Sequence, residues 1–87
     1  MAISFPNVSR SYDKSRKCIR FWGYDGAFEI AFFLDLDALS KIQMISAADE
    51  ASILGTFGRC RARIVSVASA VYRRHRQNAY TLVASDF

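Results

Sequence analysis

The sequence predicts an α+β fold with two layers, a mainly antiparallel sheet covered on one face by a short and a long helix. Two alternating apolar runs joined by Asp-Gly predict a hairpin, a long run with helical periodicity follows, and another alternating run ends the chain. Alternation is typical of strands, and apolar spacings of three and four residues are typical of helices. The expected order is β-β-β-α-α-β, in one domain over residues 1–87.

The first expected strand is a short apolar run at residues 2–5, which Pro6 terminates. Proline has no backbone N–H to donate to a neighbouring strand, so we expect this strand at an edge of the sheet. Residues 7–14 are polar and predict a turn.

Residues 17–23 and 27–34 are expected to form a hairpin, because Asp-Gly between alternating runs is a strong turn signal. With Asp25 and Gly26 as the two loop residues, Phe21 lies opposite Ile30. The core face of the hairpin then contains Ile19, Phe21, Ile30 and Phe32.

The opposite face of this hairpin is the first candidate interaction surface. It carries Trp22 and Phe33, together with Arg20 and Glu29, which we expect to form a diagonal charge pair. The face is too apolar to be an ordinary solvated surface. Two alternatives stay open, since either a partner binds there or the N-terminal or C-terminal segment covers it.

Two further elements follow from spacing. Asp35 is expected to cap a short helix over residues 36–43, where Leu36, Leu39 and Ile42 have helical spacing. Residues 79–84 alternate and predict a last strand with Tyr80 and Leu82 on one side.

The long helix is expected over residues 46–76, with Ser46 as its N-cap and Asp49 completing a capping box. We expect it to end near residues 76–78, with Asn78 as a candidate cap. Because glycine weakens a helix, Gly55 and Gly58 leave a bend or break open as an alternative.

The basic face of this helix is the second candidate surface. Residues 51–76 contain six arginines and no acidic residue, in a chain of net charge +4. Such a face is typical of an anion-binding surface or, in the interpretation that we favour, of a solvated helix. The candidate anion-contacting or ion-paired residues are Arg59, Arg61, Arg63, Arg73, Arg74 and Arg76.

Arg61 falls at the centre of the predicted apolar face, beside Phe57 and Ile64. Burying a lone guanidinium is costly, so we expect Arg61 to be paired or to reach solvent in preference to contacting a ligand. A break near Gly58 would rotate it off this face. The candidate partners are the carboxylates of Asp13, Glu29, Asp35 and Asp86 and the C-terminal carboxylate of Phe87.

Residues suited to catalysis are sparse. His75 is the only histidine, and Cys18 and Cys60 lack CxxC spacing. An activated nucleophile needs a base and an orienting group, and no glycine-rich loop with a Walker lysine occurs. We therefore expect no enzymatic activity, no catalytic residue, no metal ligand and no cofactor.

The chain shows no membrane-spanning segment, because it lacks an apolar run of about 18 residues. Its first residues also lack the apolar core of a signal peptide. We expect a cytoplasmic protein without membrane association, in which both cysteines are reduced thiols.

Several short motifs resemble the Domain of Unknown Function 1488 family of small bacterial proteins. They are Ile3 to Asn7, Arg10 to Asp13, Ile19 to Gly23, Asp37 to Leu39, Arg63 with Ile64, and Tyr80 to Phe87. The resemblance spans nearly the whole chain and implies a compact α+β domain. It implies no established activity and supplies no catalytic residues.

Two functional interpretations remain. In the first, the chain is a small interaction or structural accessory domain that binds an unknown protein or a second copy of itself. In the alternative, it binds nucleic acid weakly and non-specifically through the arginine-rich helix 51–76. Arg20 beside Trp22 lends the alternative some support, but no nucleic-acid-binding motif occurs, so the interaction domain ranks first.

Overall fold

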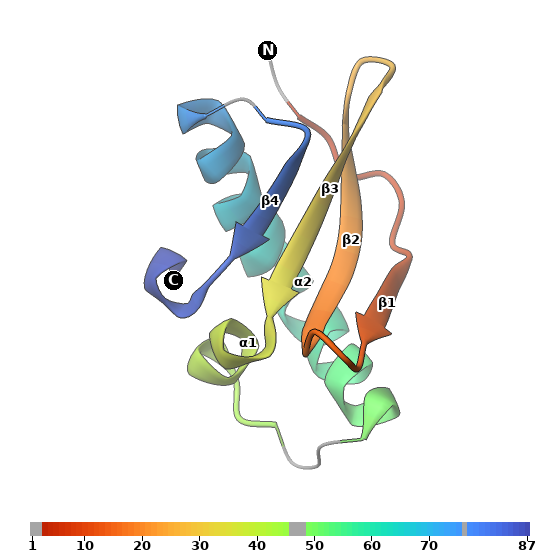
Figure 1. The fold of residues 1–87 in the computed structure, drawn as a ribbon, viewed down its shortest axis with the longest axis vertical. Helices are drawn as coiled ribbons and strands as arrows, with labels where there is room; N and C mark the ends of the chain where they lie inside the picture. The colour runs from red at the N-terminus through yellow and green to blue at the C-terminus, as the bar shows by residue number, and fades with distance from the viewer. Residues whose placement is uncertain (1–2, 46–48, 76) are drawn as a thin grey trace.

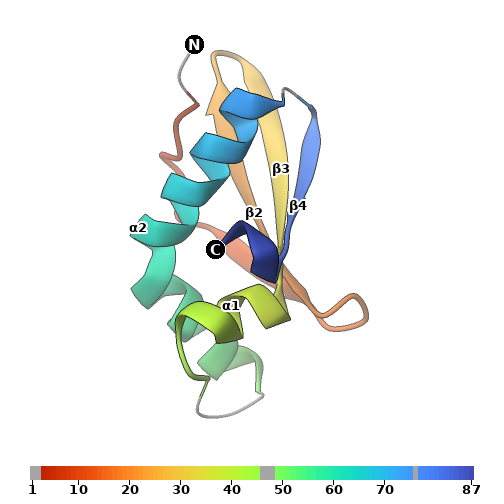
Figure 2. The same ribbon diagram turned by 90° about the vertical axis from the view of Figure 1, so that its left-hand side faces the viewer.

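The chain forms two layers, a four-stranded sheet and a pair of helices on one of its faces (Figure 1, Figure 2). The computed structural model describes residues 3–45, 49–75 and 77–87. The α+β class and the β-β-β-α-α-β order are confirmed. The elements are β1 (Arg10–Asp13), β2 (Cys18–Asp25), β3 (Phe28–Asp35), α1 (Leu36–Ile42), α2 (Glu50–Arg74), β4 (Ala79–Leu82) and the 3-10 helix η1 (Ala84–Asp86).

The strands lie in the order β1-β2-β3-β4, with β1, β2 and β3 antiparallel to one another. Strand β4 is parallel to β3, and the chain between them passes through α1 and α2. Parallel neighbours require such a crossover, which places both helices on one face (Figure 2).

The first strand is not where the sequence predicts it. Strand β1 begins at Arg10, in the polar segment expected to be a turn. In the predicted strand, Ser4 forms an isolated bridge with Tyr24, in which each backbone N–H donates to the other's carbonyl oxygen at 2.9 and 2.8 Å. An edge strand is held by backbone hydrogen bonds to its neighbour, so its side chains need not be apolar.

The hairpin forms, but its register differs from the prediction by two residues. Gly26 and Ala27 are the loop residues, and Phe21 lies opposite Phe32 instead of Ile30. Gly26 has a φ of +62°, which suits the first loop position of a type II′ turn. Because side chains alternate with period two, a shift of two residues leaves every side chain on its predicted face.

Helix α2 is continuous through both glycines, so the open alternative of a break is wrong. Its buried stripe is centred on Ile53, Phe57 and Ile64, which moves Arg61 to the border of the apolar face. The helix ends at Arg74 with His75 as its C-cap, earlier than predicted and without Asn78 as the cap.

Asp49 is the N-cap of α2, and the predicted cap Ser46 lies outside the described residues. The Asp49 carboxylate accepts hydrogen bonds from the Ser52 backbone N–H at 3.1 Å and the Ser52 hydroxyl at 2.8 Å. The hydroxyl contributes most to lowering the pKa of Asp49 below its usual 3.8. A carboxylate at a helix N-terminus also interacts favourably with the helix dipole.

We expect Asp49→Ala to destabilise the domain at neutral pH, because it removes this cap. The folded pKa of Asp49 lies below its unfolded value, so the charged cap stabilises the fold fully above pH 3.8 and this contribution is lost as the pH falls through the folded pKa. Urea unfolding of both proteins from neutral to acidic pH checks this. A stability difference between the two that does not shrink in acid contradicts the assignment.

Helix α1 and strand β4 also end slightly earlier than predicted. Helix α1 ends at Ile42, and its N-cap Asp35 makes no side-chain capping hydrogen bond. Strand β4 ends at Leu82, because the chain then turns into η1, where Asp86 accepts a hydrogen bond from the Val83 N–H at 2.8 Å. The predicted alternation holds, with Tyr80 and Leu82 buried.

The core lies between the sheet and the helices and contains a run of aromatic rings. Phe32 is fully buried, and its ring stacks on Phe21 at 5.3 Å and on Tyr80 at 5.2 Å. Phe5 packs against the same cluster from the N-terminal segment, and Phe87 packs against it from the C-terminal end. Both terminal segments therefore pack on the helix side of the sheet.

Candidate functional site

The face of the sheet that points away from the helices, called the outer face here, is the main candidate site. Alternation and strand register place its side chains together. Neither terminal segment covers it in the described part of the chain, because Ile3, Phe5 and Phe87 pack against the core. The outer face consists of Ser11, Asp13, Cys18, Arg20, Trp22, Tyr24, Glu29, Ala31, Phe33, Asp35, Ala79 and Thr81.

Two arginines lie over the aromatic rings of the outer face. The Arg16 guanidinium carbon lies 4.7 Å from the centre of the Phe33 ring. The Arg20 guanidinium carbon lies 5.1 Å from the centre of the Trp22 ring and 5.9 Å from that of Phe33. Each contact is a cation–π interaction, and both rings remain partly exposed. These four side chains form what we call the arginine–aromatic row.

Arg16 comes from the turn between β1 and β2, and no pattern in the sequence predicts its role. The Asp13 carboxylate organises this turn by accepting hydrogen bonds from the Ser15 N–H, the Ser15 hydroxyl and the Arg16 N–H. The hydroxyl of Ser15 is the main cause that lowers the pKa of Asp13. Lys17 closes the turn in the left-handed conformation, with a φ of +51°.

Shallow hollows lie on both sides of the contact between Arg16 and Phe33. One, of about 390 Å³, extends toward Ala79 and Thr81 of β4. The other, of about 670 Å³, extends toward Ser11 of β1 and Arg20. The contact between Arg16 and Phe33 therefore lies between two concave surfaces that are open to solvent.

The predicted charge pair between Arg20 and Glu29 is not formed. The register places Arg20 opposite Phe33, and Glu29 opposite Tyr24 near the hairpin turn. Glu29 instead accepts a hydrogen bond from the Tyr24 hydroxyl at 3.1 Å, which is the main reason that the pKa of Tyr24 is raised. Glu29 thus lies at the far end of the outer face from Arg16.

The predicted basic residues of α2 differ in their exposure and in their partners. Arg63, Arg73 and Arg74 are exposed, and Arg76 lies outside the described residues. Arg59 donates a hydrogen bond to the Thr56 hydroxyl at 3.1 Å.

Arg61 has a structural partner, but it is not one of the predicted carboxylates. Its guanidinium donates to the backbone carbonyl oxygens of Phe5 at 2.7 Å and Asn7 at 3.3 Å. Arg10 makes a similar contact in the other direction, donating to the Leu54 carbonyl oxygen at 3.0 Å. These two arginines fasten the N-terminal part of the chain to α2.

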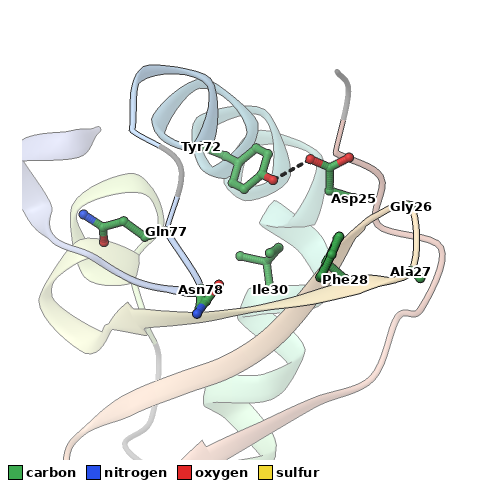
Figure 3. A pocket seen from close by; sticks show the side chains of 8 residues that line it. All are labelled: Asp25, Gly26, Ala27, Phe28, Ile30, Tyr72, Gln77 and Asn78. Atoms are coloured by element: carbon green, nitrogen blue, oxygen red, sulfur yellow. Dashed lines mark hydrogen bonds between the residues drawn. The ribbon is translucent and has the colours of Figure 1, made fainter.

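A third concave region lies where the β2–β3 hairpin extends past the end of α2 (Figure 3). Asp25, expected to be one of the two loop residues of the hairpin, is instead the last residue of β2 and is buried. Its carboxylate accepts a hydrogen bond from the Tyr72 hydroxyl at 2.5 Å. Sequence reasoning missed this pair because Asp-Gly is so typical of a hairpin loop.

Cys18 and His75, considered as a nucleophile and its base, are widely separated. Strand β2 begins at Cys18 and α2 ends beside its C-cap His75, and these two ends lie at opposite ends of the molecule (Figure 1). Burial raises the pKa of the Cys18 thiol, which disfavours the reactive thiolate, and both cysteines are free thiols.

Residues 3–45, 49–75 and 77–87 contain no group of three or more His, Cys, Asp or Glu side chains placed to hold a metal ion. None of the helices in the same ranges is both long enough and apolar enough to cross a membrane.

Comparison with known proteins shows the same fold in a solved structure. A crystal structure at 1.60 Å resolution of a DUF1488-family protein of unknown function from Shewanella loihica PV-4 superimposes with a TM-score of 0.81. The two chains are 15% identical, and the match covers 93% of this chain and 91% of the other. No curated protein matches this chain. The family model described as "Protein of unknown function (DUF1488)" matches residues 3–83, and the chain belongs to this family.

Proposed function

We propose that this domain is a non-enzymatic interaction module that binds a protein partner through the outer face. The observation that carries the proposal is the arginine–aromatic row, which neither helix nor terminal segment covers among the described residues. Tryptophan and arginine are enriched at the energetic centres of protein interfaces. Partly exposed rings beneath exposed guanidinium groups offer apolar area and charge at one place.

The partner surface that suits this face carries carboxylates beside apolar side chains. Arg16 and Arg20 are exposed, and Lys14 and Lys17 are exposed in the adjoining turn. The carboxylates of Asp13 and Asp35 also lie at this end of the face, so four cationic side chains stand against two anionic ones there. The charge offered to a partner at this end of the face is therefore mainly positive, which favours an acidic surface.

Site-specific photo-crosslinking in cells tests this proposal. A photoreactive phenylalanine analogue at position 33 is expected to give light-dependent adducts with a protein, because Phe33 lies at the centre of the row. The matched control carries the analogue at position 63, since Arg63 is exposed on α2 in the other layer. Trp22→Ala is expected to weaken partner binding by about 2 kcal/mol or more while leaving the helical circular dichroism intact.

The outcomes of this experiment separate the proposals. Absence of protein adducts at position 33, or equal yields at positions 33 and 63, contradicts binding through the outer face. An adduct of twice the mass of the chain identifies a second copy as the partner, and sedimentation then shows a dimer that Trp22→Ala dissociates.

The alternative, weak nucleic-acid binding through α2, has one supporting observation, the exposure of Arg63, Arg73 and Arg74. It predicts nucleic-acid adducts at position 63 and retention on heparin that falls steeply with salt. Binding at α2 would leave the emission of Trp22, the only tryptophan, unchanged.

A further inference from the structure

We propose that the pocket at the open end of the hairpin binds a small organic amine, with its ammonium group at Asp25 and its apolar part against Phe28 and Ile30. The pocket has a volume of about 430 Å³, within the range of about 300–1,000 Å³ that is typical of small-molecule sites. It lies on the core side of the sheet, so this inference is independent of the proposed function of the outer face.

The pocket exists because the core loses its helical cover before the hairpin ends. Phe28, Ile30 and Phe32 follow one another on the core face of β3, but α2 ends at Arg74 and leaves the Phe28 side chain 75% exposed. Ile30 is buried at 3% exposure. The loop residues Gly26 and Ala27 have no side chains large enough to fill the space. An apolar wall is thus left facing solvent beside the end of the core.

The polar side of the pocket is a buried carboxylate. Asp25 is only 7% exposed, and it is the one acidic residue among the described lining residues. The Tyr72 hydroxyl donates to its Oδ2 at 2.5 Å, and Figure 3 shows the two side chains facing each other from β2 and α2. A carboxylate has about four lone-pair positions, so this one keeps acceptor capacity for a ligand. A cationic donor suits a buried carboxylate better than a neutral one.

The remaining wall of the pocket is formed by Gln77 and Asn78, in the loop between α2 and β4, and hydrogen bonds hold these residues in place. The Asn78 carbonyl oxygen accepts a hydrogen bond from the Ala31 N–H at 3.2 Å. The Tyr80 hydroxyl accepts from the Gln77 N–H at 2.6 Å and donates to the His75 carbonyl oxygen. Of the described residues of this loop, Gln77 and Asn78 line the pocket. Figure 3 shows the Gln77 side chain pointing away from Asp25, so Asn78 is the residue whose amide can hydrogen-bond to a ligand there. The pocket is therefore formed before any ligand arrives.

Three probes of one shape and different charge test the inference: 2-phenylethylamine, 2-phenylethanol and phenylacetate. Titration of the ¹⁵N-labelled protein with the amine is expected to shift the amide signals of Gly26, Ile30 and Asn78. The neutral alcohol is expected to bind about tenfold more weakly, because it lacks the charge-assisted hydrogen bond. Phenylacetate is expected not to bind, because its carboxylate would face Asp25.

Asp25→Asn is the matched variant, since it keeps the shape of the side chain and an acceptor for Tyr72 but removes the charge. It is expected to abolish the preference for the amine over the alcohol. Phe28→Ala removes an exposed wall without opening the core, and it is expected to weaken the binding of both compounds. The dispersion of the ¹⁵N spectra shows whether each variant is folded.

Three results overturn the inference. One is the absence of shifts at the pocket amides in the wild-type protein up to the solubility limit of the amine. Another is equal binding of amine and alcohol, or a preference for the amine that survives in folded Asp25→Asn. The third concerns Arg76, which precedes the pocket residue Gln77 and lies outside the described residues. Amine binding that appears only in Arg76→Ala would show that the chain's own guanidinium takes the place assigned to the ligand.

Discussion

Phe32→Ala is expected to destabilise the domain by about 3–5 kcal/mol, the range typical of removing a buried aromatic ring. Phe32 is fully buried, and it contacts the rings of Phe5, Phe21 and Tyr80. These neighbours come from the N-terminal segment, β2 and β4, so collapse around the cavity requires all three to move. A small domain has a total stability of about 5–15 kcal/mol, so the variant is expected to be largely unfolded or close to it.

Phe28→Ala is the matched control for this experiment. Phe28 is the same residue type on the same strand and the same face of the sheet, but its side chain is 75% exposed. We expect its effect to be within about 0.5 kcal/mol of zero. Urea unfolding followed by circular dichroism and by the emission of Trp22 measures both variants. Equal midpoints for the two would show that Phe32 is not the centre of the core.

Gly23→Ala is expected to destabilise the domain by about 1–3 kcal/mol, the range typical of overpacking a core. A Cβ atom at Gly23 would lie 2.7 Å from Cε2 of the Phe5 ring and 2.9 Å from Cδ1 of Ile3. The Phe5 ring packs against the rings of Phe21 and Phe32, with centroids 6.0 and 5.5 Å apart. The backbone carbonyl oxygen of Phe5 also accepts a hydrogen bond from Arg61. The added methyl group therefore displaces the N-terminal segment from the core.

Gly55→Ala is the control for this experiment, and it is expected to change the stability of the domain in the opposite direction. Gly55 lies inside α2, and the nearest atom to an added Cβ would be Arg59 Nη1 at an ordinary 3.7 Å. Alanine is favoured over glycine in a helix by up to about 1 kcal/mol, so this variant is expected to be more stable than the wild type. Faster hydrogen exchange at the Ser4 and Tyr24 amides in Gly23→Ala alone would locate the damage in the N-terminal segment. A Gly23→Ala protein as stable as Gly55→Ala would contradict the close approach of Phe5.

The sequence by itself determined which side chains of the hairpin share a face. Alternation along β2 and β3 is a local property, and it assigns Ile19 and Phe21 to the core and Arg20 and Trp22 to the outer face without any knowledge of the partner strands. The same locality explains why α2 could be predicted from the spacing of its apolar residues. The part of the outer face that lies on the hairpin was therefore predictable from the sequence, whereas Ser11 and Asp13 of β1 were not.

The tertiary structure alone decided how those local elements were aligned. A register shift of two residues leaves every side chain on the same face of the sheet, so alternation cannot distinguish the predicted pairing from the observed one. The contact between Asp25 and Tyr72 exists only in the observed pairing. The hydrogen-bond partners of Arg61 could not be predicted from the sequence either. Every residue carries a backbone carbonyl oxygen, and no side chain identifies which of these oxygens approach the guanidinium. The place of Arg16 over Phe33 depends likewise on how the turn after β1 folds back across the sheet, which is a matter of three-dimensional contact and not of local pattern.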